Sequence, residues 1–114
     1  MKLKIKNATI ITPFRTIKNG TVLVDNGKII DVLEKDKPFL GATEIDAEGH
    51  YLAPGFIDIH IHGGGGHDFM DGTEAAFLGI AEKHAEYGTT AMVPTTLTSE
   101  KPDLLNTLDV YKSA

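Results

Sequence analysis

The sequence predicts an α/β protein with two parts, a small antiparallel β-sheet domain over residues 1–53 and a strand–helix–strand–helix region over residues 54–114. In the first part, short β-branched segments are separated by turn dipeptides. In the second part, apolar strand-like segments alternate with segments whose apolar residues recur every three or four positions. This alternation predicts a parallel sheet with right-handed crossovers, as in a β/α barrel or a doubly wound fold.

Turn chemistry organises the first part. Strand character is found in residues 3–6, 8–11, 21–24 and 28–32. The dipeptides Asn19-Gly20 and Asn26-Gly27 are typical of hairpin turns and predict two connections. The charged residues 34–49 predict a loop that leads into a short strand near residues 43–46. We expect the lysine and aspartate faces to be solvated and interpret this sheet as a structural module.

The second part opens with a mostly apolar strand within residues 51–62, and a second one follows within residues 89–96. Such strands are typical of sheets that are covered on both faces. Between them, Thr73 is placed to cap a helix that ends near Gly88. The apolar positions of this helix are Ala76, Phe77, Ile80, Ala81 and Ala85.

A further helix is predicted after the second strand. Ser99 is its expected N-cap, and Pro102 falls in its first turn. Its apolar side is expected to consist of Leu104, Leu105 and Leu108.

Asp58, His60 and His62 occupy alternate positions of the first apolar strand. Because a strand sends residues i, i+2 and i+4 to one face, the two imidazoles are expected to point at one place. Imidazole is a common metal ligand, so His60 and His62 are candidate ligands of one divalent ion, although an ordinary polar pair is the alternative. Asp58 lies deeper in the strand, which favours a hydrogen bond to a ligand or a structural role over direct ligation.

Four glycines, Gly63, Gly64, Gly65 and Gly66, follow the histidine pair, and His67 comes next. Glycine permits backbone dihedral angles that other residues avoid, so we expect a loop beside the metal that closes flexibly over a substrate. Phosphate binding by the loop backbone is an alternative, but the Lys-Ser/Thr of a phosphate-binding loop is absent. His67 is a candidate substrate contact or a solvated residue.

Two other features beyond the glycine run are weaker. His84 is expected on the surface or at an interface of the first helix. Thr95 and Thr96 end the second strand and are candidates for shaping the site.

Composition excludes several classes of partner. The formal net charge of -5 and the absence of a Lys/Arg cluster argue against nucleic-acid binding. No apolar stretch is long enough for a membrane span, and the N-terminus alternates instead of forming a signal peptide, so a cytoplasmic protein is expected. Without cysteine, ligation must use nitrogen and oxygen, which leaves zinc, iron, manganese, nickel and cobalt open.

Residues 53–73, residues 87–96 and the Asn26-Gly27-Lys28-Ile29 turn resemble the amidohydrolase superfamily, and more narrowly its N-acetylglucosamine-6-phosphate deacetylase family. The similarity runs over essentially the whole chain. It implies that the small sheet is part of a β-sandwich and that residues from 54 onward are the first two β/α units of a metal-dependent (β/α)8 barrel. A complete barrel takes about 250 residues, so the barrel is expected to be truncated here.

The resemblance implies hydrolysis of N-acetylglucosamine 6-phosphate to glucosamine 6-phosphate and acetate, with a small-molecule amino-sugar phosphate as partner. His60 and His62 would be metal ligands. The family's proton-transferring aspartate, a glutamate and two further histidines fall in segments outside this chain, which is therefore expected to be inactive alone.

Two other functions stay open. One is a cyclic-amide hydrolase of the same superfamily, such as a dihydroorotase or hydantoinase, although Asp68-Phe69-Met70-Asp71 after the glycines favours the amino-sugar enzyme. The other is a non-catalytic metal-binding or interaction module. Unpaired strands and apolar faces would then be covered by a second copy, so a homo-oligomer is expected.

Overall fold

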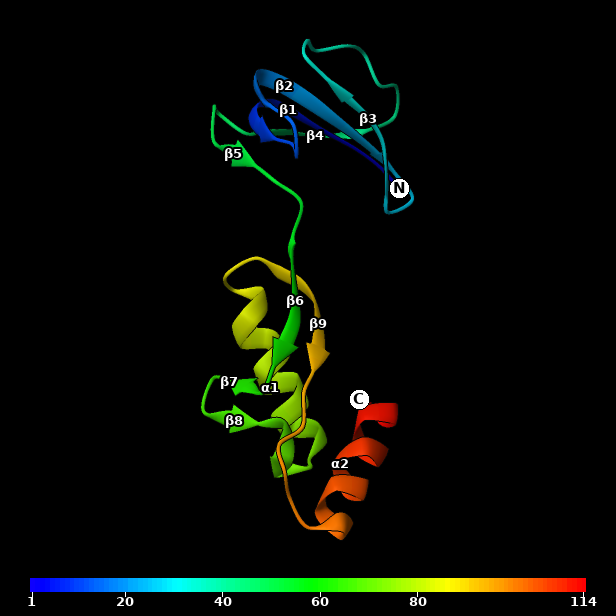
Figure 1. The fold of residues 1–114 in the computed structure, drawn as a ribbon. Helices are drawn as coiled ribbons and strands as arrows, with labels where there is room; N and C mark the ends of the chain where they lie inside the picture. Colours follow the sequence, from blue (N-terminus) through cyan, green and yellow to red (C-terminus); the bar gives the residue numbers. More distant parts are fainter. The chain divides into compact units, whose positions relative to one another are not determined.

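The computed structural model describes all 114 residues, which form two compact units, Met1–Pro54 and Gly55–Ala114. Strands dominate the chain and helices are few (Figure 1). Each unit buries a hydrophobic cluster of its own. None of the helices combines the length and the apolar character that crossing a membrane requires.

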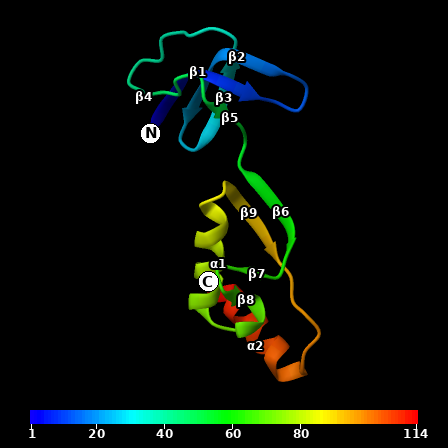
Figure 2. The same cartoon turned by 90° about the vertical axis from the view of Figure 1, so that its left-hand side faces the viewer.

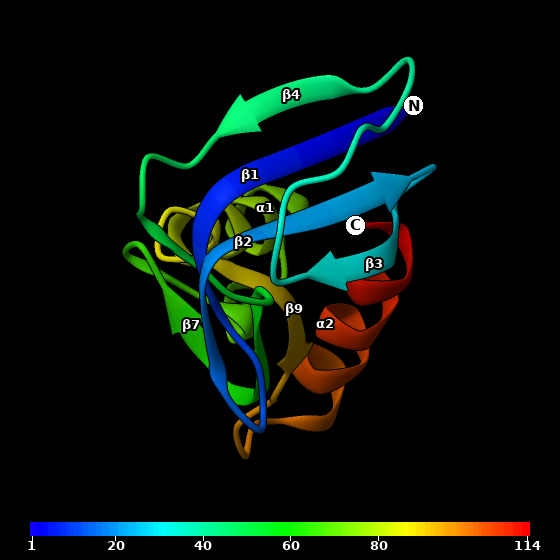
Figure 3. The same ribbon diagram turned by 90° about the horizontal axis from the view of Figure 1, so that it is seen from above.

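The first unit is one five-stranded sheet. Its strands are β1 (Lys2–Ile11), β2 (Thr16–Asp25), β3 (Lys28–Leu33), β4 (Thr43–Asp46) and β5 (Tyr51–Leu52). The order across the sheet is β3-β2-β1-β4 (Figure 3). β5 also pairs with β1. β1, β2 and β3 pair antiparallel, as predicted, but β4 and β5 run parallel to β1. The predicted antiparallel sheet is therefore confirmed for β1, β2 and β3 but wrong for β4 and β5, because the long segment after β3 lets the chain re-enter in the direction of β1.

The two Asn-Gly dipeptides have different roles. Asn26-Gly27 is the predicted β2–β3 turn, with φ of 48° and 75°, and positive φ at both central residues is what a type I′ turn requires. Asn19-Gly20 does not form a turn: it lies inside β2, where Asn19 has φ of 53° and the pairing with β1 shifts register at Ala8. Positive φ serves a bulge as well as a turn, so the dipeptide alone did not distinguish them.

The β1–β2 connection is instead a turn between Thr12 and Arg15. The Thr12 amide donates to the Arg15 carbonyl at 3.0 Å, and the Thr12 hydroxyl oxygen accepts from the Arg15 amide at 3.0 Å. The short polar side chain thus supplies the turn geometry that glycine would otherwise give.

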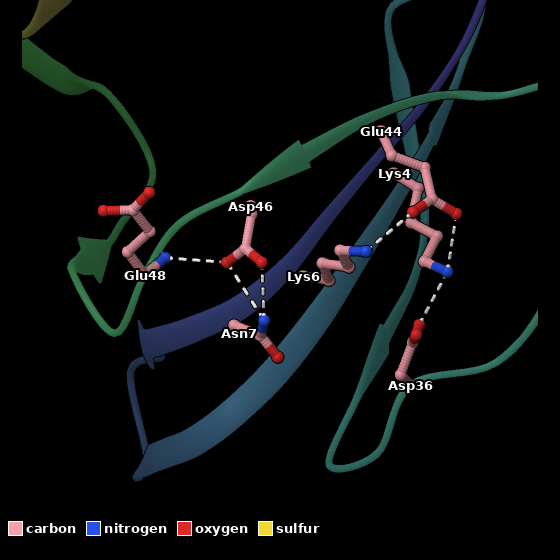
Figure 4. A network of polar contacts seen from close by, with 7 residues as sticks. All are labelled: Lys4, Lys6, Asn7, Asp36, Glu44, Asp46 and Glu48. Atoms are coloured by element: carbon pink, nitrogen blue, oxygen red, sulfur yellow. Dashed lines mark hydrogen bonds and ion pairs between the residues drawn. The ribbon is translucent and has the colours of Figure 1, made fainter.

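The lysine face of β1 is not fully solvated, contrary to expectation (Figure 4). The Lys4 side chain is 5% exposed, and its Nζ lies 2.8 Å from Asp36 Oδ1 and 2.9 Å from Glu44 Oε1. Lys6 Nζ lies 2.9 Å from Glu44 Oε2. Hydrogen bonds to Asp36 and Glu44 raise the pKa of Lys4, and those from Lys6 and Lys4 lower the pKa of Glu44. These contacts tether the loop after β3 to β1 and β4.

The second unit contains a parallel strand pair, β6 (Phe56–Ile61) and β9 (Thr89–Pro94), which lie side by side in Figure 2. Between them come β7 (Gly63–Gly64), β8 (His67–Asp68), the 3-10 turn η1 (Phe69–Asp71) and α1 (Glu74–Ala85). The last element is α2 (Lys101–Ser113). The predicted alternation of strand and helix with parallel strands is therefore confirmed.

α1 follows the prediction closely. The Thr73 hydroxyl oxygen accepts from the Ala76 amide at 3.2 Å, which caps the helix. Ala76, Phe77 and Ile80 are buried, and Phe77 and Ile80 pack in one cluster with Ile61 and Phe69.

α2 differs from its prediction. Its N-cap is Glu100, without a side-chain cap, so the prediction of Ser99 was wrong. The Ser99 hydroxyl instead donates to the Asp103 carboxylate, with Oγ and Oδ2 3.5 Å apart. The predicted leucine side of this helix is not the buried side, since Leu105 and Leu108 are 50% and 43% exposed. The helix buries Thr107, whose hydroxyl donates to the Phe69 carbonyl at 3.3 Å.

The two strands of the second unit are not covered on both faces, contrary to expectation. Ile57 and Ile59 are 68% and 77% exposed, and Val93 is 52% exposed. Ile61 is 6% exposed because Phe69 packs on it. β6 and β9 pair with each other and with no third strand, which leaves most of their apolar side chains open.

Candidate metal centre

His60 and His62 come together at the C-terminal end of β6. Their Nε2 atoms are 3.2 Å apart, and the two rings meet edge to face with centroids 5.1 Å apart. The alternation of side chains along the strand produces this arrangement, since residues two apart share a face. His60 is exposed and His62 half-buried, so the pair is open to solvent on the side of His60.

The geometry of the pair fits one divalent ion. Imidazole nitrogens bind zinc at about 2.0–2.1 Å, so two ligands at a tetrahedral angle have nitrogens roughly 3.3 Å apart. The distance of 3.2 Å between the two Nε2 atoms is close to that value. The spacing of the two Nε2 atoms is therefore compatible with one shared ion.

Thr95 fixes the ring of His62. His62 Nδ1–H donates to the Thr95 carbonyl at 2.9 Å, and this bond leaves the lone pair on Nε2, the nitrogen that faces His60. A ligand histidine is commonly oriented in this way through its other nitrogen. The Thr95 amide also donates to the Ile61 carbonyl at 2.8 Å, so the residue after β9 is tied to the end of β6.

Asp58 supports the backbone of the pair and contacts neither imidazole. Its Oδ1 accepts the His60 backbone amide at 3.1 Å, and the side chain is half-buried. This hydrogen bond holds the local backbone, and a role of Asp58 beside a metal ligand stays a prediction.

The glycine run forms a short hairpin, and its flexibility over a substrate stays a prediction. Gly63 and Gly64 pair with Asp68 and His67, and Gly65-Gly66 form the turn with φ of 63° and 87°. Two successive positive φ angles are the conformation that glycine adopts at little cost. The hairpin therefore leaves β6 directly after His62 and returns into η1.

His67 does not point freely over the pair. Its ring lies against Gly79 of α1, and its Nδ1 is 3.8 Å from Asp71 Oδ2. His84 of α1, which was expected on the surface or at an interface, is half-buried, and its Nε2 lies 3.3 Å from the Gly63 carbonyl oxygen. Sequence reasoning missed this contact because 21 residues separate its two ends.

No group of three or more metal-binding side chains gathers anywhere in the chain. The candidate metal centre in this chain thus consists of two ring nitrogens, the Nε2 atoms of His60 and His62.

The chain is similar in sequence to enzymes of two kinds. It is 36% identical over 80 residues to a dihydroorotase from Listeria welshimeri, a match that covers 66% of this chain and 18% of that protein. The more extensive similarity is to N-acetylglucosamine-6-phosphate deacetylase: the chain is 39% identical over 108 residues to the enzyme from Bacillus subtilis, covering 93% of this chain. The resemblance seen in the sequence is thereby confirmed. No protein-family model matches the chain.

The fold agrees with this similarity. The structure matches the crystal structure of N-acetylglucosamine-6-phosphate deacetylase from Pasteurella multocida with a TM-score of 0.89 and 27% identity over 99% of this chain. The chain spans 27% of the length of the Bacillus subtilis relative and 30% of the Pasteurella multocida chain.

Proposed function

We propose that this chain contributes to a metal-dependent deacetylase that hydrolyses the N-acetyl group of N-acetylglucosamine 6-phosphate, giving glucosamine 6-phosphate and acetate. The observation that carries the proposal is the His60–His62 pair, with Nε2 atoms 3.2 Å apart, in a chain 39% identical to such an enzyme. The substrate would be a small-molecule amino-sugar phosphate.

A divalent ion held by His60 and His62 would supply Lewis-acid chemistry, which polarises an amide carbonyl and makes water a nucleophile near neutral pH. The nitrogen ligands are compatible with zinc, iron, manganese, nickel or cobalt. The chain's own residues hold the ligands in place: Thr95 orients the ring of His62, and Asp58 binds the backbone of His60.

The position of the pair supports a barrel. We propose that β6, α1, β9 and α2 are the first two units of a (β/α)8 barrel and that the first unit of the chain is part of a β-sandwich. Active sites of such barrels lie at the C-terminal ends of the strands. His62 and Thr95 directly follow the ends of β6 and β9, where such a site would be. The proton-transferring aspartate and the remaining ligands would come from segments outside these 114 residues.

The proposal is tested by comparing the deacetylase activity of two proteins, this chain and a longer one that contains it. Acetate release from N-acetylglucosamine 6-phosphate is measured for this chain and for the product of any longer reading frame that contains it, each supplied with the five candidate metals. We expect turnover from the longer product and none from this chain. The matched control is His60→Ala/His62→Ala in the longer product, which should be inactive. A longer product that is inactive with every metal would refute the deacetylase assignment.

A cyclic-amide hydrolase is the second candidate. The dihydroorotase match over 80 residues favours it, whereas the deacetylase match extends over 108 residues. Hydrolysis of dihydroorotate and of a hydantoin by the same longer product separates the two. Turnover of either ring, without acetate release, would replace the first proposal.

A non-catalytic interaction module is a third candidate, because much apolar surface is open. An apolar hollow of about 280 Å³ on the first unit is lined by residues that include Ile5, Val24 and Ile29. The mass of this chain in solution, with and without divalent metal, tests whether copies associate. A homo-oligomer and a cytoplasmic location stay predictions.

A further inference from the structure

Two histidines outside the metal pair lie between the glycine hairpin and α1, and each faces a glycine of the other element. His84 of α1 lies so close to Gly64 that a Cβ at that position would be 2.5 Å from His84 Nε2. His67 of β8 lies so close to Gly79 that a Cβ there would be 2.7 Å from His67 Cδ2. Carbon atoms of folded proteins do not approach so closely, so the hairpin and α1 fit together in this way because both positions are glycine. We call this pair of contacts the interlock.

One of the two contacts of the interlock lies next to His62, a candidate metal ligand. His84 Nε2–H donates to the carbonyl of Gly63, the residue that follows His62, at 3.3 Å. The carbonyl of His62 itself accepts the Phe69 amide at 2.9 Å, and Phe69 is 1% exposed in the core of the second unit. Two successive carbonyls on the C-terminal side of His62 are thus held, one by α1 and one by the core beside it.

The ring of His62 has one further anchor, the Thr95 carbonyl. The place of its Nε2 depends on both that anchor and the backbone, because the ring swings with its own Cα. We propose that His84, with His67 as its counterpart, is a positioning residue that holds His62 in register for metal binding by locking the hairpin onto α1. The metal part of this inference rests on the proposed function, whereas the interlock does not.

A double-mutant cycle tests the inference. Alanine at Gly64 would collide with the far end of the His84 side chain, so it displaces the imidazole and has the same consequence as His84→Ala. The affinity of this chain for Ni²⁺ is measured by calorimetry. We expect about tenfold weaker binding for Gly64→Ala, for His84→Ala and for the double variant alike. Unchanged affinity in His84→Ala, or losses that multiply in the double variant, would overturn the inference.

Two further variants separate positioning from a general effect on folding. Gly66→Ala changes the same hairpin at a residue with φ of 87° and no atom within 4 Å of an added Cβ, so its loss should multiply with that of His84→Ala. His84→Gln keeps an N–H donor and should recover part of the affinity. Equal loss in His84→Gln and His84→Ala would count against the hydrogen bond to Gly63. Gly79→Ala and His67→Ala form the reciprocal cycle if Gly64→Ala fails to fold.

A metal-free measurement distinguishes failure of the interlock from failure of the metal centre. Nitrogen NMR of the histidine rings should show the His62 signals moving in the same way in Gly64→Ala and His84→Ala. Wild-type Ni²⁺ binding no stronger than that of His60→Ala/His62→Ala, with these shifts present, would refute the metal centre and keep the interlock. Normal Ni²⁺ binding without the shifts would refute the interlock.

Discussion

The two units are similar in length but use their polar side chains differently. In Met1–Pro54, charged side chains pair with one another across strands, as Lys4 and Lys6 do with Glu44. In Gly55–Ala114, imidazoles bond to backbone carbonyls that are distant in the sequence, as His62 does to Thr95 across 33 residues and His84 to Gly63 across 21. An ion pair at a surface tolerates small displacements of either partner, whereas a ring nitrogen bonded to a carbonyl fixes both the ring orientation and its proton.

The two kinds of contact have different roles: the ion pairs fasten a loop, and the imidazole–carbonyl bonds orient a side chain. The ion pairs of the first unit fasten a long loop, a role in which the exact place of each charge matters little. The carbonyl bonds of the second unit set the direction of a lone pair, which is what a metal ligand requires. The candidate metal ligands lie in the unit where imidazoles bond to distant backbone carbonyls.

The largest loss of stability is expected from substitutions in the hydrophobic cores of the two units. Phe69 is 1% exposed and packs edge to face on Phe77 with ring centroids 4.7 Å apart. Phe69→Ala should destabilise the second unit by about 3–5 kcal/mol. Leu23 is 2% exposed in the first unit, and Leu23→Ala should destabilise that unit by about 2–5 kcal/mol.

Hydrogen exchange of α1 and β2 amides measures the two units separately. Phe69→Ala should speed exchange in α1 and leave β2 unchanged, and Leu23→Ala should do the reverse. Equal loss of protection in both units from either variant would show that they do not unfold separately.

Acid should weaken the first unit. Lys6 and Lys4 lower the pKa of Glu44 below its ordinary 4.5, and Lys37 and the Glu48 amide lower those of Asp31 and Asp46 below 3.8. A lowered pKa means that the stabilisation is present above the ordinary value and is lost as the pH falls through the folded-state value. Protection of β2 amides should therefore decrease below about pH 4.5. A first unit equally stable at pH 7 and pH 3 would contradict the assigned ion pairs.

A smaller loss of stability is expected when one carboxylate is removed from the ion-pair network of Lys4, Lys6, Asp36 and Glu44. Glu44→Gln leaves the buried Lys4 with Asp36 as its remaining charged partner, so the melting temperature should fall and its acid dependence should flatten. Glu34→Gln is the matched control, because Glu34 pairs with Arg15 and both side chains are 62% exposed. It should have little effect. Equal shifts in the two variants would mean that the network is an ordinary surface contact.

The smallest effect is expected on the open face of β6. Ile59 is 77% exposed, and Ile59→Ala should change stability by less than about 0.5 kcal/mol. Ile61 is 6% exposed on the same strand, and Ile61→Ala should cost about 2–5 kcal/mol. Chemical denaturation monitored by circular dichroism compares the two. An equal cost would show that another surface covers Ile59 in solution.

Short-range patterns predicted much of the local structure. Alternation along a strand predicted that His60 and His62 come together, and capping chemistry predicted Thr73. The positive φ of Asn26-Gly27 was predicted from the same kind of rule. In each case the partners are within four residues, so the sequence itself carries the geometry.

Contacts between distant residues could not be predicted. Lys4 pairs with Glu44 across 40 residues, His62 bonds to Thr95 across 33, and His84 reaches Gly63 across 21. Each depends on how the strands and helices pack, which local pattern does not encode. Asn19-Gly20 failed for a related reason, because only the pairing with β1 decides whether it is a turn or a bulge.

The most direct test of the account is the binding of one divalent ion by His60 and His62. Ni²⁺ is titrated into this chain by calorimetry at mildly alkaline pH, because a metal ion binds only the neutral form of an imidazole. We expect about one ion per chain, and we expect this binding to be lost in His60→Ala and in His62→Ala. It should be retained in His50→Ala, which removes an imidazole of the first unit bonded to the Ala47 carbonyl. Undiminished binding in His60→Ala/His62→Ala would contradict the account.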